Sequence, residues 1–117
     1  MIVFLTKDLM MSSNASSHAR QNQLKLKTID SADSAINYIL ENRPHLFLID
    51  LQTPGLVVSQ LGEQVRELPD SVSPLTVAYA QHVNADLLNE AKAAGFDQVL
   101  TRGQVNSQIG QIVAEAG

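Results

Sequence analysis

The stretch LFLIDLQTPGL, residues 46–56, joins four apolar residues to an aspartate and then to a turn at Pro54-Gly55. Successive strand residues point to opposite faces of a sheet, so four apolar residues in a row predict a strand that is buried on both faces. Proline followed by glycine favours a tight turn directly afterwards. We therefore expect Asp50 at the carboxyl end of a central strand, where open α/β sheets place their binding sites.

Four further apolar runs of strand length recur along the chain, at residues 2–6, 24–29, 75–79 and 99–101. Segments with the spacing of amphipathic helices alternate with them, at residues 9–22, 31–44, 57–68, 84–95 and 105–113. This alternation predicts a (βα)5 protein, in which a parallel five-stranded sheet is covered by helices on both faces.

Local signals refine this prediction. Ser31 and Asn84 are expected helix N-caps, and Gly95 is expected to end a helix in the left-handed conformation. Residues 9–22 give the weakest helical signal, because their serines compete for backbone hydrogen bonds. In residues 24–29, LKLKTI, both lysines fall on one face, which is typical of an edge strand protected by charge.

The composition excludes several classes of protein. With 117 residues, 44% of them hydrophobic and 17% charged, residues 1–117 are expected to form a single globular domain. The chain has no cysteine, which excludes disulfide scaffolds and thiolate zinc sites. No apolar run is long enough for a membrane span and no signal peptide is evident, so we expect a cytoplasmic protein with no membrane partner. The net charge is −4 and the eight basic residues are scattered, which argues against nucleic-acid binding.

The spacing of several residues is characteristic. Pro54 follows Asp50 by four positions, Ala80 by thirty, and Gly95 lies fifteen further on, within AKAAGFDQVL; Arg102 comes seven later. This pattern resembles the response-regulator receiver domain over essentially the whole chain. The resemblance implies the CheY-like fold, a doubly wound flavodoxin-like three-layer sandwich with strand order 2-1-3-4-5. It also implies that Asp50 occupies the position of the family's phosphoacceptor.

The chain departs from the family at other pocket positions. Two adjacent acids that help to bind Mg²⁺ in receivers correspond to Lys7 and Asp8, a threonine or serine corresponds to Ala80, and a lysine followed by proline corresponds to Arg102. A lysine in place of an acid repels a cation, and alanine cannot donate a hydrogen bond to an acyl phosphate. These differences are typical of a degenerate receiver, or pseudo-receiver, that needs no metal or other cofactor. If Mg²⁺ binds after all, Asp8 and Asp50 are its expected ligands.

Two residues of this pocket have a second interpretation. Arg102 can form a two-pronged ion pair with Asp50, so we expect a pocket closed by these two side chains with Lys7 nearby. Asp8 precedes the helix that begins near Leu9, and an aspartate there also serves as an N-cap.

Three functions follow as hypotheses. In the first, the domain is not an enzyme but a phosphorylation-independent interaction module of signal transduction. It docks a partner signalling protein, or its own copy, through the face formed by the fourth helix, fifth strand and fifth helix, residues 84–113. In the second, it is a working two-component response regulator of a phosphorelay, in which a histidine kinase or a small phosphodonor phosphorylates Asp50. The third, a flavodoxin-type ligand binder, is disfavoured because no glycine-rich phosphate loop follows the first strand.

Overall fold

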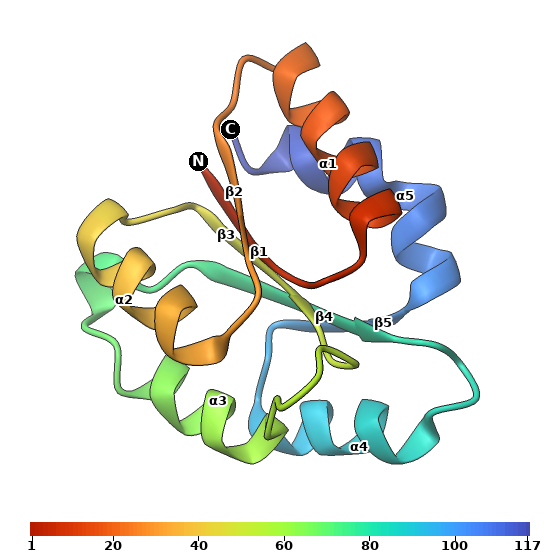
Figure 1. Cartoon of the computed structure of the whole chain (residues 1–117). Coiled ribbons are helices and arrows are strands. Elements are labelled where there is room, and N and C mark those ends of the chain that lie inside the picture. The colour runs from red at the N-terminus through yellow and green to blue at the C-terminus, as the bar shows by residue number, and fades with distance from the viewer.

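Five parallel strands form one sheet in the order β2-β1-β3-β4-β5, with helices on both faces (Figure 1). The computed structural model describes residues 1–117. The strands are β1 Ile2–Leu5, β2 Leu26–Ile29, β3 Leu46–Asp50, β4 Leu75–Ala80 and β5 Gln98–Thr101. The helices are α1 Leu9–Gln21, α2 Ala32–Asn42, α3 Val58–Arg66, α4 Ala85–Ala94 and α5 Arg102–Glu115, with a short 3-10 turn at Asp70–Val72. The predicted (βα)5 order and strand order are confirmed.

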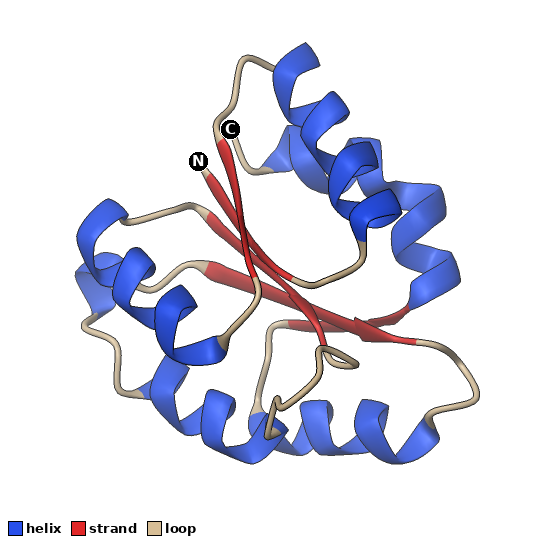
Figure 2. Ribbon diagram, in the orientation of Figure 1, coloured by secondary structure: helices blue, strands red, loops and turns tan.

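The sheet separates two apolar cores. Helices α1 and α5 pack on one face, and α2, α3 and α4 pack on the other (Figure 2). Every residue of β3 is buried, and its side chains alternate between the two cores, as the continuous apolar run at residues 46–49 predicted. The weakly predicted helix at residues 9–22 is formed, with Met11, Ala15 and Ala19 buried against the sheet.

Helix ends follow the predicted chemistry with one exception. The Ser31 hydroxyl accepts a hydrogen bond from the backbone N–H of Ser34, and Gly95 ends α4 at a φ of +84°. Asn84 occupies the N-cap position of α4, but its side chain makes no capping hydrogen bond. Strand β2 lies at the edge of the sheet, and Lys25 before it and Lys27 within it are both exposed, as predicted. None of the helices is both long and apolar enough to cross a membrane.

Helices α3 and α4 approach each other closely at a glycine. A Cβ atom added to Gly62 would lie 2.7 Å from the Cβ of Ala94, closer than two carbon atoms can pack. The Arg66 side chain of α3 then donates a hydrogen bond of 2.7 Å to the carbonyl of Ala94, near the end of α4. The two helices are therefore joined by direct packing and by a hydrogen bond at a helix terminus.

We predict that Gly62→Ala destabilises the fold, although alanine is the better helix former, because the added methyl group overpacks the contact with Ala94. The expected loss is about 1–3 kcal/mol in the free energy of unfolding, measured by urea denaturation. Gly103→Ala is the matched control, since the nearest atom to its added Cβ is 4.0 Å away. This control is expected to be neutral or stabilising by up to about 1 kcal/mol. Equal effects of the two substitutions would contradict the close approach.

Candidate functional site

The candidate site lies where β1 and β3 end side by side. Leu5 pairs with Ile49 in the parallel register, so Thr6 and Asp50 are the next residues of the two strands. The Thr6 hydroxyl donates a hydrogen bond of 2.7 Å to Oδ2 of Asp50, and the backbone N–H of Gln52 donates one of 3.0 Å to Oδ1. Only 8% of Asp50 is exposed. Each carboxylate oxygen of Asp50 therefore accepts one hydrogen bond from the protein itself.

Arg102 pairs with Asp8. Its guanidinium lies 2.5 Å from Oδ2 of Asp8, and Oδ1 of the same carboxylate accepts a hydrogen bond of 3.0 Å from the backbone N–H of Met11. Asp8 is thus the N-cap of α1, as one interpretation predicted. The prediction of an ion pair between Arg102 and Asp50 is wrong, because Arg102 pairs with Asp8. Asp8 attracts Arg102 instead because it is only partly buried and lies at the rim of the site, whereas Asp50 is buried and already hydrogen-bonded.

Thr6 connects the Asp50 carboxylate to the backbone of Asp8. Its hydroxyl oxygen accepts a hydrogen bond of 2.9 Å from the backbone N–H of Asp8, while its proton goes to Asp50. Of the other predicted pocket residues, Lys7 is exposed and forms no ion pair, and Ala80 is buried in the core beneath α2, α3 and α4. The structure therefore brings Asp8 and Arg102 together, and it places Asp50 next to a threonine that the sequence analysis did not single out.

The Asp8 carboxylate is stabilised in its charged form. The N–H of Met11 lowers the pKa of Asp8 below its usual value, burial opposes this shift, and Arg102 lowers the pKa further. The N-terminus of a helix favours a negative charge, so the cap and the ion pair act in the same direction.

A buried phenol lies under the site. Tyr79 is 1% exposed, its ring packs edge-to-face against Phe4, and its hydroxyl has no hydrogen-bond partner. Burial raises the pKa of Tyr79, and the negative charge of Asp50 raises it further, so the phenol stays protonated.

The side chains present form no ready-made cluster for a Mg²⁺ ion. Mg²⁺ requires a near-octahedral set of oxygen ligands, and the chain has no cluster of three acidic or histidine side chains that could hold a metal. One carboxylate of the site is hydrogen-bonded through both oxygens, and the other is paired with a guanidinium. A cation would have to displace these protein groups, so we assign no chemical step to a metal here.

Solved structures share this architecture at low sequence identity. The receiver domain of a response regulator from Bermanella marisrubri matches with a TM-score of 0.81 and 15% identity, over 98% of this chain and 95% of that one. The receiver domain of a sensor histidine kinase from Pseudomonas aeruginosa, with a magnesium ion coordinated in its active-site cleft, matches with a TM-score of 0.80 and 12% identity, over 98% and 94%. The receiver domain of Ssk1 from Saccharomyces cerevisiae, in complex with the phosphotransfer protein Ypd1, matches with a TM-score of 0.78 and 18% identity, over 99% and 87%.

The chain has the receiver-domain fold. No protein-family model and no curated protein matches its sequence. The likeness therefore lies in the three-dimensional arrangement, which supports the fold implied by the spacing of Asp50, Ala80, Gly95 and Arg102.

Thr6 is the site residue that sequence reasoning missed. A usable signal was present, because Thr6 and Asp50 are each the first polar residue after an apolar strand. In neighbouring parallel strands such residues meet at the same edge of the sheet. The resemblance to receiver domains points instead to the next two residues, Lys7 and Asp8.

We predict that stability falls in acid through Asp8. A carboxylate whose pKa is lower in the folded state stabilises the fold above its unfolded pKa, near about 4, and this contribution disappears as the pH falls through the folded pKa. Asp8→Asn keeps an acceptor for the Met11 N–H but loses the charge. It should therefore lower the stability at pH 7 and make the loss of stability in acid smaller than in the wild type. Urea denaturation across this pH range measures both; identical acid profiles would contradict the assignment.

We predict that Tyr79→Phe leaves the fold equally stable or more stable by roughly 1 kcal/mol, because it removes a buried hydroxyl that has no partner. Thr6→Val is the contrasting variant, since it removes the proton donor to the Asp50 carboxylate. Thr6→Val should lower the free energy of unfolding by roughly 1–3 kcal/mol. A loss of similar size in Tyr79→Phe would show that the phenol is hydrogen-bonded in solution.

Proposed function

We propose that this chain is a receiver-fold domain of signal transduction that acts as a protein–protein interaction module without being phosphorylated, and that it is not an enzyme. The observation that carries the proposal is the state of Asp50. Its two oxygens accept hydrogen bonds from Thr6 and Gln52, and the nearest arginine is paired with Asp8. Phosphoryl transfer depends on positioned cations that offset the charge of the phosphoryl group, and this arrangement supplies no metal site.

We propose the face formed by α4, β5 and α5 as the docking surface. Strand β5 is an edge strand with no fully buried residue, and Ala91 is the only buried residue of α4. Leu87, Leu88 and Val99 are half-buried there, so this part of the fold has apolar area that a partner can still cover. A partner signalling protein or a second copy of the chain would bind it. The Ssk1 receiver domain, which has this fold, is seen bound to a signalling protein.

A working response regulator is the second candidate. Asp50 favours it, because a carboxylate stands at the end of β3 in the position that the family uses for phosphorylation. In that case a donor would have to displace Thr6 from Oδ2 and recruit Mg²⁺ with Asp8 and Asp50 as ligands.

The test is intact-mass spectrometry after incubation with Mg²⁺ and a small acyl-phosphate donor. We expect no gain of a phosphoryl group, while an ordinary receiver domain treated in the same way is modified. Asp50→Asn is the control for modification at this residue. A phosphoryl group that appears on the wild type and is absent from Asp50→Asn would overturn the proposal and establish the response regulator.

A further inference from the structure

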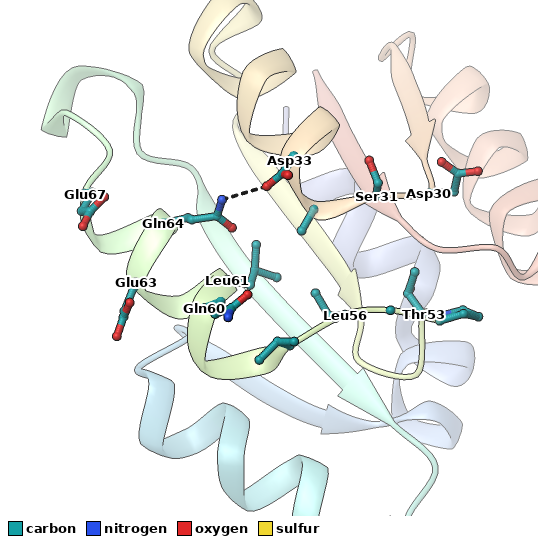
Figure 3. Close-up of a pocket in the computed structure, with 14 residues that line it drawn as sticks. Asp30, Ser31, Asp33, Thr53, Leu56, Gln60, Leu61, Glu63, Gln64 and Glu67 are labelled. Atoms are coloured by element: carbon teal, nitrogen blue, oxygen red, sulfur yellow. Dashed lines mark hydrogen bonds between the residues drawn. The ribbon is translucent and has the colours of Figure 1, made fainter.

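A groove of about 520 Å³ runs between α2 and α3, on the sheet face away from α1 and α5 (Figure 3). Its walls come from the start of α2, from the connection between β3 and α3, and from α3 itself. Apolar side chains line its floor, and they include Leu56, Leu61 and the half-exposed Val57. One hydrogen bond, 3.1 Å from Nε2 of Gln64 to Oδ1 of Asp33, bridges the two walls.

The charged side chains that line the groove are all acidic. Four exposed carboxylates line it, and no basic side chain does; the four are Asp30, Asp33, Glu63 and Glu67. None of the four forms an ion pair within the chain. The only arginine of α3, Arg66, instead reaches away to the carbonyl of Ala94.

The carboxylates are spread along the groove rather than gathered at one point. Figure 3 shows Asp30 by the end of β2, Asp33 in α2, Glu63 in α3 and Glu67 just past the end of α3. No three acidic groups of the chain are close enough together to hold a metal ion. This spacing matches an extended occupant with several positive charges better than it matches a single cation.

Both ends of α3 depart from what a helix prefers, and both departures line the groove. Val57 is the N-cap of α3, where it makes no capping hydrogen bond and is 48% exposed, although serine, threonine, aspartate and asparagine are the favoured residues there. At the other end, Glu63 lies in the last turn and Glu67 is the C-cap, where the helix dipole disfavours negative charge. Local rules are broken in this way at functional sites, where binding and not stability selects the residue.

We propose that the groove between α2 and α3 docks a segment of a partner protein that carries several lysine or arginine residues next to an apolar side chain. The basic side chains pair with the four carboxylates, and the apolar side chain covers Val57 and Leu56. This surface uses different helices from the α4–β5–α5 face, so it can fail or succeed independently of the proposed function.

The probe is a short fluorescein-labelled peptide of alternating lysine and leucine, with the same peptide carrying glutamate in place of lysine as a control. Fluorescence anisotropy measures its affinity, and amide chemical shifts locate it. We expect the lysine peptide alone to bind, more weakly as salt is raised, with shifts confined to residues 30–36 and 53–67.

Two triple variants of equal charge separate the groove from general electrostatic attraction. Asp33→Asn with Glu63→Gln and Glu67→Gln should weaken binding roughly tenfold, since three exposed charge pairs are removed. The variant combining Glu41→Gln, Asp86→Asn and Glu90→Gln removes three exposed charges elsewhere and should change the affinity less than about twofold. Equal losses in the two variants would overturn the proposal.

A third variant separates binding from folding. Val57→Ser adds a favoured N-cap, so it should raise the urea midpoint of unfolding. It should nevertheless lower the affinity for the lysine peptide, because the apolar contact with Val57 is lost. Three outcomes would refute the docking site: no binding of the lysine peptide at millimolar concentration, shifts centred on α4 and α5, or displacement of the peptide by low concentrations of Mg²⁺ or Ca²⁺ alone.

Discussion

The hydrogen bond from Thr6 to Asp50 holds the carboxyl edge of the sheet together. Asp50 is buried, and a buried carboxylate must be hydrogen-bonded or paired to be tolerated. Thr6 supplies one partner from the neighbouring strand and at the same time accepts the N–H of Asp8, which starts the first helix. The chain leaving β3 is tied to the same place, because the Thr53 hydroxyl donates to the carbonyl of Asp50. Three hydrogen bonds at Thr6 and Asp50 therefore tie the start of α1 and the β3–α3 connection to this edge of the sheet.

The fold could be predicted from the sequence because its signals are local and repeated. Each strand is an apolar run, and each helix has its own apolar stripe, so errors at individual ends did not change the order of elements. The helix at residues 9–22 formed despite its serines because Met11, Ala15 and Ala19 are buried between the sheet and α5, so tertiary packing outweighed local propensity.

The site was harder to predict because its partners are chosen in three dimensions. Arg102 has two possible carboxylate partners, Asp8 and Asp50. The sequence does not say which of them is buried and which lies at the rim of the site. Thr6 was overlooked because a threonine at a strand end has no chemical signature of its own until the register places it beside an aspartate. The groove between α2 and α3 was likewise invisible, since its acidic residues fall in two pairs that lie thirty positions apart along the chain.

The contact between α3 and α4 has a mechanical consequence. Gly62 allows the two helices to touch, and Arg66 holds the last turn of α4 by its carbonyl. A shift of α3 along its axis would therefore break both contacts unless α4 moved with it. The wall of the groove is in this way linked to the helix that packs beside the edge strand β5.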